Sequence, residues 1–440
     1  MNGGDHASLD WIASPGAPIR GELRVPGDKS VSHRAIMLGA LADGISEVQG
    51  FLEGEDTRAT AAAFAAMGVR IEVPGDGKRI IHGVGLHGLK APARAIDCGN
   101  AGTGMRLLAG LLAGQAFDSE LVGDASLSRR PMRRVTEPLA LMGARIDTAD
   151  GGVPPLRINA NNGLQGIEIS TSVASAQVKS ALLLAGLYAS GTTEIREPHP
   201  TRDYTERMLA AMGWPIEFSP GFARLQGGGQ LNPVRINVPA DFSSAAFFIV
   251  AATVVPGSEL LLKGVGLNPR RTGLLDALKA MGADITVVNP REEGGEPVGD
   301  LRVRSAALNG IEVPVALVPD MIDEFPALFV AAATAEGVTR VRGAAELRVK
   351  ESDRIALMAE GLRSLGIRVE ETPDGADIHG GSFQGGEIDS GGDHRIAMSF
   401  VVAAQLAKES VQIRDCANVA TSFPGFAATA RSLGLKLSIE

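Results

Sequence analysis

The sequence has few aromatic residues, only two cysteines and no long apolar run. Aromatic residues make up 4% of the 440 residues, which disfavours the stacked aromatic platforms that bind single-stranded nucleic acid. Cys98 and Cys416 have neither metal-site nor redox-pair spacing, so we expect both to be small buried hydrophobic residues in a reducing cytosol. The longest apolar run, 245–255, is shorter than the ~20 residues that a membrane helix needs.

The chain also lacks an excess of positive charge. Its formal net charge is -9, and a field of that sign repels nucleic acid and anionic membranes. An anionic substrate would therefore have to be held by local arginines and lysines. Residues 1–10 are polar and rich in glycine, without an apolar signal segment, and we expect them to form a loose leader.

A repeated pattern organises the rest of the chain. A helical segment ending in Met-Gly or Leu-Gly, followed by a short alternating segment, recurs at intervals of roughly 70 residues. Glycine suits the position just after a helix, and alternation is typical of a half-buried strand. The six glycines are Gly68, Gly143, Gly213, Gly282, Gly366 and Gly434.

Each repeat also holds an alanine-rich segment that is apolar all round, which predicts a helix buried on all sides. These segments are 35–41, 105–112, 178–187, 245–255, 327–333 and 396–406. Two short segments resemble each other, Val25-Pro26-Gly27-Asp28 and Val238-Pro239-Ala240-Asp241. Their positions indicate that the six units form two lobes of three. We predict a leader and first strand at 1–27 that pack with the C-terminal lobe, an N-terminal lobe at 28–238 and a C-terminal lobe at 239–440.

Polar residues gather where the predicted inner helices begin. The stretch 27–34 places Lys29, Ser30 and Arg34 at such a start, where free backbone N–H groups favour anions. One such cluster is usually an ordinary helix cap, but a similar polar cluster begins the predicted inner helix of every unit. Six starts that face a shared cleft would add their positive ends, which predicts a substrate with several negative charges and favours two substrates over one.

The motifs exclude several kinds of chemistry. The sequence has no phosphate-binding P-loop, no dinucleotide fingerprint and no cluster with metal-ligand spacing. Acid–base chemistry by carboxylates and lysine among arginines remains, with Asp323 and Glu351 as the carboxylates that have basic or helix-start neighbours.

Five ordered motifs resemble the enolpyruvyl transferases, and most closely the branch that acts on shikimate 3-phosphate. The motifs are 27–34, 99–106, 348–354, 393–398 and 422–424, and the resemblance covers nearly the whole chain after the leader. Ser422 stands where many relatives have a lysine, and the sequence is similar to the second class of the family. The resemblance implies a two-lobed inside-out α/β barrel of six βαβαββ units, three per lobe, with the active site in the cleft between the lobes.

The implied reaction moves the enolpyruvyl group of phosphoenolpyruvate to the 5-hydroxyl of shikimate 3-phosphate, with release of phosphate by addition and elimination. It belongs to the shikimate pathway of aromatic amino acid biosynthesis, through chorismate. No metal or organic cofactor is implied. We expect a cytoplasmic protein, a monomer by default, that acts on these two small molecules without a nucleic-acid or membrane partner.

The resemblance also assigns roles to residues. Asp323 is the implied base on the 5-hydroxyl, Glu351 the proton shuttle, and Lys29 a catalytic contact to both substrates. The implied shikimate 3-phosphate contacts are Lys29, Ser30, Arg34, Ser175, Ala176, Gln177, Arg202, Asp323 and Lys350. The implied phosphoenolpyruvate contacts are Lys29, Gly102, Arg130, Gln177, Arg354 and Arg395.

Other interpretations of the same residues stay open. Asp323 could only cap the following helix, Glu351 could only pair with Arg354, and Lys179 could contact phosphate or a carboxylate of its own lobe. Two other functions are alternatives: an enolpyruvyl transferase for UDP-N-acetylglucosamine, and a non-catalytic anion-binding protein on the same scaffold. The first usually has Lys-Asn where this chain has Lys29-Ser30, and the second would be favoured by loss of Asp323 or Glu351.

Overall fold

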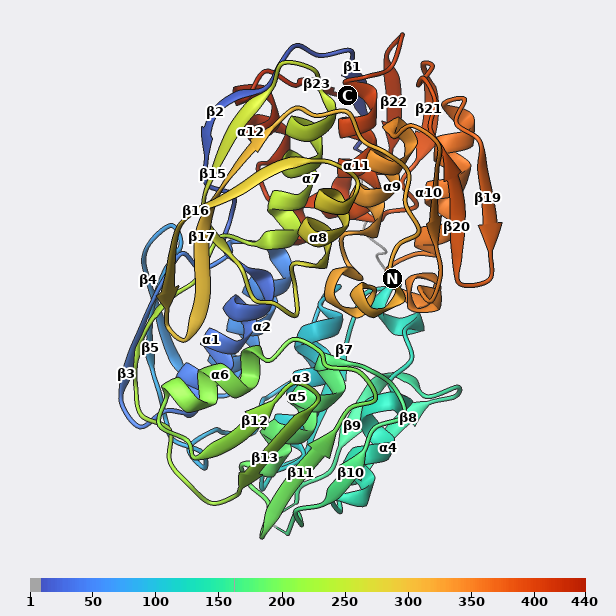
Figure 1. Cartoon of the computed structure of the whole chain (residues 1–440). Coiled ribbons are helices and arrows are strands. Elements are labelled where there is room, and N and C mark those ends of the chain that lie inside the picture. The colour runs from blue at the N-terminus through green and yellow to red at the C-terminus, as the bar shows by residue number, and fades with distance from the viewer. Residues whose placement is uncertain (1–8, 162) are drawn as a thin grey trace. The chain divides into compact units, whose positions relative to one another are not determined.

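The computed structural model describes residues 9–161 and 163–440, which form two compact units (Figure 1). The N-terminal unit comprises Gly27–Pro239 and Glu292–Glu296, and the C-terminal unit comprises residues 9–26, Ala240–Arg291 and Pro297–Glu440. Most of the predicted leader, residues 1–8, lies outside the described residues. Within the described ranges, no helix combines the length and apolar character that a membrane crossing requires.

The N-terminal unit contains three four-stranded sheets. The first has the strand order β14 (Arg235–Asn237), β3 (Ile45–Gln49), β5 (Lys78–His82) and β4 (Arg70–Gly75). The second has the order β6 (Ile96–Asp97), β7 (Ser119–Val122), β9 (Val153–Ile158) and β8 (Ile146–Ala149). The third has the order β10 (Glu168–Ser170), β11 (Thr192–Arg196), β13 (Phe222–Gln226) and β12 (Ile216–Ser219).

The C-terminal unit also contains three sheets. The first has the strand order β16 (Asp284–Glu293), β17 (Glu296–Arg304), β15 (Glu259–Gly266) and β2 (Arg20–Leu23). The second has the order β18 (Val338–Val341), β20 (Gly375–His379) and β19 (Val369–Thr372). The third has the order β21 (Gly386–Asp389), β22 (Val411–Arg414), β1 (Trp11–Ser14) and β23 (Lys436–Ile439).

The sheets repeat one pairing scheme, which is the structural form of the predicted sequence repeat. In each four-stranded sheet an outer strand runs parallel to its neighbour, and that neighbour runs antiparallel to the next strand. In the three-stranded sheet, the parallel bridges Asn309↔Glu336 and Glu312↔Arg340 lie where the outer strand would be. The prediction of six similar α/β units, three per lobe, is therefore confirmed.

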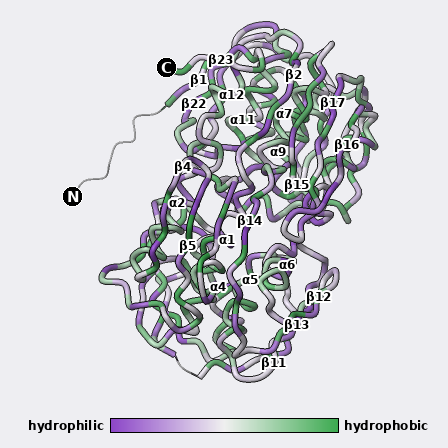
Figure 2. Tube along the Cα trace, turned by 90° about the vertical axis from the view of Figure 1, so that its left-hand side faces the viewer, coloured by the Kyte–Doolittle hydropathy of each residue, from purple (hydrophilic) through white to green (hydrophobic). Residues whose placement is uncertain are grey.

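Three helices in each unit are buried along nearly their whole length, as the apolar runs predicted. They are α1 (Lys29–Leu41), α3 (Gly102–Leu112) and α5 (Ala176–Gly186) in the N-terminal unit, and α7 (Phe242–Val254), α9 (Phe325–Thr334) and α11 (His394–Ala404) in the C-terminal unit. Their apolar composition can be followed in Figure 2 at the labels α1, α5 and α7. Each unit has its own hydrophobic core, to which these helices contribute.

Each buried helix is accompanied by a helix with an exposed face. These outer helices are α2 (Glu55–Ala66), α4 (Arg133–Leu141), α6 (Tyr204–Ala211), α8 (Gly273–Ala280), α10 (Arg354–Ser364) and α12 (Phe426–Ser432). Each ends at a Met-Gly or Leu-Gly pair, and Gly68, for example, has a φ of 90° that only glycine adopts easily. The outer helices and sheets thereby keep the inner helices out of water.

The two buried helices α3 and α5 approach each other very closely at Gly110. A Cβ atom added there would lie 2.1 Å from the backbone oxygen of Ala181, which cannot rotate away. At Gly39 of α1, by contrast, an added Cβ would meet the flexible end of Ile81 at 2.9 Å. The close crossing of α3 and α5 therefore depends on the absence of a side chain at residue 110.

Gly110→Ala should destabilise the protein, although alanine usually favours a helix by about 1 kcal/mol. Overpacking against rigid backbone costs about 1–3 kcal/mol, so we expect a net loss in urea-unfolding stability. Gly39→Ala is the matched control, because its steric conflict is with a side chain that can move. Equal stability for the two variants would contradict the close approach of α3 and α5.

Candidate active site

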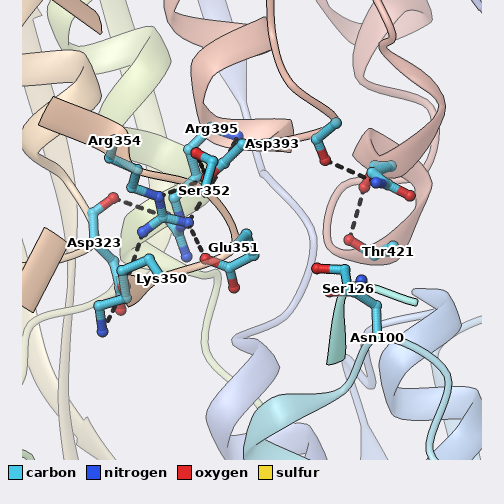
Figure 3. A network of polar contacts seen from close by, with 12 residues as sticks. Asn100, Ser126, Asp323, Lys350, Glu351, Ser352, Arg354, Asp393, Arg395 and Thr421 are labelled. Atoms are coloured by element: carbon cyan, nitrogen blue, oxygen red, sulfur yellow. Dashed lines mark hydrogen bonds and ion pairs between the residues drawn. The ribbon is translucent and has the colours of Figure 1, made fainter. Parts of the chain in front are cut away.

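The C-terminal unit contains a group of charged side chains centred on Arg354, the first residue of α10 (Figure 3). The Arg354 side chain is 1% exposed, and its Nε donates to Asp393 Oδ2 at 2.8 Å. Its Nη2 donates to Glu351 Oε2 at 2.5 Å, and its Nη1 lies 3.5 Å from Asp323 Oδ1. One buried cation thus holds three carboxylates of separate segments, which we call the Arg354 cluster.

Asp323 lies where several cations of this cluster meet. Its carboxylate is 3.9 Å from Lys350 Nζ and 3.6 Å from Arg271 Nη1, in addition to Arg354. Arg395 donates through Nη1 to the backbone oxygen of Asp323 at 3.1 Å. The N-cap position of α9 is Glu324, so Asp323 lies one residue before the cap.

Burial and ion pairing have opposite effects on the pKa values in this cluster. Burial acts to lower the pKa of Arg354, but the carboxylates of Asp393, Glu351 and Asp323 outweigh it and raise that pKa. Burial acts to raise the pKa of Asp393, and Arg354 reverses the effect, so the pKa of Asp393 is lowered. At Lys350 burial prevails over Asp323 and lowers the pKa of the ammonium group.

In the N-terminal unit, Arg34 on α1 is fixed from several sides. Its Nε donates to Thr205 Oγ1 at 2.7 Å and its Nη2 to Ser180 Oγ at 2.8 Å, while Nη1 donates to the backbone oxygen of Ser30 at 2.9 Å. Burial outweighs the nearby carboxylates of Glu206 and Asp28 and lowers the pKa of Arg34 to about 10. Three neutral oxygens fix the direction of the guanidinium, which is a group suited to binding a carboxylate.

Lys29 and Lys179 both pair with carboxylates of their own unit. Lys29, at the start of α1, forms a salt bridge with Asp56 of α2. Lys179 lies 2.8 Å from Glu197 and 2.9 Å from Glu206, and its side chain is 3% exposed. The structure therefore supports the interpretation in which Lys179 pairs with carboxylates of its own lobe.

Arg130 lies beside the glycine-rich start of α3. Its Nη2 donates to Asn100 Oδ1 at 2.5 Å, and Asn100 is held in turn by Asp124 at 2.6 Å. A Cβ atom at Gly102 would lie 2.9 Å from Arg130 Nη1. A glycine at this position therefore gives the guanidinium room next to the first turn of α3.

Gln177 joins the starts of α3 and α5. It accepts from Arg106 Nη1 at 2.6 Å and donates to Thr103 Oγ1 at 2.8 Å. Ser175 is the N-cap of α5, where its side chain accepts from the Val178 N–H at 3.4 Å, and Ala176 is the first helical residue. These contacts place Ser175, Ala176 and Gln177 at one helix start.

The helix starts differ in charge, which corrects the prediction that all six attract anions. Asp28, Asp241 and Asp393 cap α1, α7 and α11 through their carboxylates, and these negative groups offset the positive helix ends. The caps of α3 and α5 are the neutral residues Ala101 and Ser175. Helix ends therefore favour anions mainly at α3 and α5, and elsewhere arginine and lysine side chains supply the positive charge.

The structure groups the proposed residues by unit. Asp323, Lys350, Glu351, Arg354 and Arg395 lie together in the C-terminal unit, and the other proposed residues lie in the N-terminal unit, at or near the starts of α1, α3 and α5. Among the residues that the structure describes, no group of three or more His, Cys, Asp or Glu side chains has the arrangement of a metal site.

Sequence reasoning missed several partners of these residues, namely Asp56, Ser180, Thr205, Arg271 and Asp393. Asp56 is 27 residues along the chain from its partner Lys29, and Arg271 is 52 residues from its partner Asp323. No local sequence pattern marks such distant pairs. Asp393 was visible as a helix start, but its ion pair with Arg354 was not.

Solved structures give the class of this fold. EPSP synthase from Acinetobacter baumannii matches with a TM-score of 0.89 and 52% identity, over 98% of this chain and 100% of that one. The enolpyruvyl transferase NikO from Streptomyces tendae matches with a TM-score of 0.81 at 18% identity, over 98% of this chain and 99% of that one, and so shares the fold. The two-unit architecture is thus that of the enolpyruvyl transferases.

Sequence comparison gives the family. Residues 13–429 match the model of the family EPSP synthase (3-phosphoshikimate 1-carboxyvinyltransferase), and the chain belongs to that family. A 3-phosphoshikimate 1-carboxyvinyltransferase of Xanthomonas euvesicatoria pv. vesicatoria is 67% identical over 97% of each chain. One of Xanthomonas campestris pv. campestris is 68% identical over 98% of this chain and 99% of its own.

Lys350 should lose its proton at a lower pH than an ordinary lysine, because burial lowers the pKa of its ammonium group. The unfolded chain keeps that proton up to about pH 10.4. Between the lowered pKa and that value the unfolded state binds more protons, so this group makes stability rise with pH. Carbon NMR of lysine labelled at Cε measures the titration directly, and Lys350→Arg assigns the signal by its disappearance. A Lys350 signal that titrates together with exposed lysines would show that burial does not control this group.

Proposed function

We propose that this protein transfers the enolpyruvyl group of phosphoenolpyruvate to the 5-hydroxyl of shikimate 3-phosphate and releases phosphate. This is the reaction of the family to which the chain belongs, and it serves the shikimate pathway. The observation that carries the proposal is the position of Asp323, whose carboxylate lies within 4.0 Å of Lys350, Arg354 and Arg271. A carboxylate held among cations can accept a proton from a hydroxyl group while anionic substrates remain bound.

In the addition step, the 5-hydroxyl oxygen bonds to C2 of phosphoenolpyruvate and its proton passes to Asp323. C3 gains a proton, which we assign to Glu351, and becomes a methyl group. In the elimination step, the methyl group loses a proton, the double bond forms again and the bond from C2 to the phosphate oxygen breaks. Glu351 is suited to shuttle this proton, because Arg354 fixes its carboxylate at 2.5 Å.

Substrate binding is assigned to cations that the protein already holds in place. Arg34 would bind the carboxylate of shikimate 3-phosphate with Ser30, and Lys29 would contact both substrates. Ser175, Ala176, Gln177 and Arg202 would bind the phosphate of shikimate 3-phosphate, which fits the neutral cap of α5. Lys350 would contact shikimate 3-phosphate beside Asp323.

Phosphoenolpyruvate is assigned to the start of α3 and to arginines of both units. Gly102, Arg130 and Gln177 would bind it in the N-terminal unit, and Arg354 and Arg395 in the C-terminal unit. Arginine suits this role because its planar fork matches carboxylate and phosphate groups. The existing contacts of Arg130 with Asn100 and of Arg354 with Asp393 reduce the freedom lost on binding.

The proposal includes a monomer that works in the cytoplasm on these small molecules. Both cysteines are free and buried, which supports a protein that does not depend on disulfide bonds.

Phosphate release should require both substrates. Purified protein mixed with shikimate 3-phosphate and phosphoenolpyruvate should release phosphate in a colorimetric assay, and either substrate alone should release none. A control replaces shikimate 3-phosphate by UDP-N-acetylglucosamine. Equal release with that sugar nucleotide would move the function to the other branch of the enolpyruvyl transferases.

Asp323→Asn and Glu351→Gln should each lower kcat by about 10²- to 10⁴-fold, the usual contribution of a general acid or base. Both changes keep the size of the side chain, so binding of shikimate 3-phosphate, followed by calorimetry, should change far less than kcat. Glu370→Gln is the control, because Glu370 is an exposed residue paired with Arg368. Turnover at the control's rate in either test variant would remove that residue from the mechanism.

A further inference from the structure

One buried lysine of the N-terminal unit joins three separate points of the chain. Lys179 lies near the start of α5, and its Nζ is 2.8 Å from Glu197 Oε2 and 2.9 Å from Glu206 Oε1. The same Nζ donates to the backbone oxygen of Thr201 at 3.4 Å. Glu197 directly follows β11, Thr201 lies in the loop before α6, and Glu206 lies in α6. Lys179 thus attaches both ends of the segment 197–206 to α5.

A further contact closes this segment into a loop. Thr201 Oγ1 donates to Glu197 Oε1 at 2.5 Å, so one carboxylate oxygen faces the threonine and the other faces Lys179. Burial acts to lower the pKa of Lys179, but Glu206 and Glu197 outweigh it and raise that pKa. The lysine is therefore charged at neutral pH. Both carboxylates depend on it, because a buried carboxylate without a cation is strongly unfavourable.

The residues next to these ion-paired groups lead to two arginines. Thr201 precedes Arg202, to which we assign the phosphate of shikimate 3-phosphate. Glu206 follows Thr205, whose hydroxyl oxygen accepts from Arg34 Nε at 2.7 Å. The two arginines are near enough for their charges to interact, as expected if one anionic molecule binds to both.

Helix α5 supplies a second group that holds Arg34. Ser180 directly follows Lys179 in the sequence. The Ser180 hydroxyl oxygen accepts from Arg34 Nη2 at 2.8 Å and from Thr205 Oγ1 at 2.8 Å. The hydroxyl pair and the ion pair of Lys179 with Glu206 therefore join α5 to α6 at adjacent residues. A shift of α6 against α5 would separate the two hydroxyl groups that orient the guanidinium of Arg34.

We propose that Lys179 is a positioning residue for shikimate 3-phosphate. By holding the segment 197–206 against α5, it places Arg202 for the phosphate group and Arg34 for the carboxylate. The ammonium group is enclosed by its carboxylate partners, so it acts through the arginines and not on the substrate. The proposal rests on the function proposed above, since it takes shikimate 3-phosphate as the ligand of these arginines.

Lys179→Met removes the cation and nearly keeps the length of the side chain. The dissociation constant of shikimate 3-phosphate, measured by calorimetry without phosphoenolpyruvate, should rise about 10- to 100-fold, because each displaced arginine loses roughly the tenfold value of one hydrogen bond. The value of kcat should stay near that of the wild type, and KM for phosphoenolpyruvate should change far less. Lys78→Met, at an exposed lysine of the same unit, is the control and should bind as the wild type does.

Thr201→Val is the second variant, because it leaves no charge buried alone and tests the proposal even if Lys179→Met fails to fold. It removes the hydroxyl bond to Glu197, so the dissociation constant of shikimate 3-phosphate should rise about three- to tenfold. The dissociation constant of shikimate, which lacks the phosphate group, should stay unchanged. A general loss of structure would weaken the binding of both ligands.

Two results would overturn the role of Lys179. One is wild-type affinity for shikimate 3-phosphate in Thr201→Val or in folded Lys179→Met. The other is an equal loss of affinity for shikimate and shikimate 3-phosphate in Thr201→Val, which would indicate a merely structural contact. Wild-type protein that binds shikimate 3-phosphate but releases no phosphate with phosphoenolpyruvate would contradict the proposed function, and the affinities of the variants would still decide the role of Lys179. Wild-type protein that does not bind shikimate 3-phosphate would overturn both.

Discussion

The buried ion pair between Arg354 and Asp393 is the interaction on which the rest of the proposed active site depends. Both side chains are almost inaccessible to water, so neither charge can exist there without the other. Removing one partner of such a pair costs about 3–5 kcal/mol, because it leaves the other charge buried alone. The remaining N–H groups of Arg354 then fix the positions of Glu351 and Asp323.

The N-terminal unit holds its buried guanidinium group with different partners. There Arg34 is oriented by the hydroxyl groups of Thr205 and Ser180 and by a backbone oxygen, and the carboxylates of Glu206 and Asp28 act on its charge from nearby. The neutral caps of α3 and α5 leave positive helix ends beside Gly102 and Gln177. A chain with a net charge of -9 can thereby hold anions, because cations and helix ends act over short distances where screening is weak.

The sequence predicted the repeated architecture because its signals are local. The glycines that end the outer helices and the apolar runs of the inner helices can be read within about a dozen residues. The motif 27–34 likewise placed Arg34 at a helix start. Contacts such as Lys29 with Asp56, or Asp323 with Arg271, arise only after distant segments pack. The acidic caps of α1, α7 and α11 were present in the sequence, but their effect on the charge of each helix start required the observed side-chain geometry.

In the proposed reaction, cations and carboxylates already held by the protein bind both substrates and move the protons. A crystal structure with shikimate 3-phosphate and phosphoenolpyruvate bound tests it most directly. In that structure the carboxylate of shikimate 3-phosphate should lie on Arg34, with the bonds to Thr205 and Ser180 retained, and its 5-hydroxyl should lie within hydrogen-bond distance of Asp323. Electron density for both substrates that leaves Arg34 and Asp323 without a contact would contradict it.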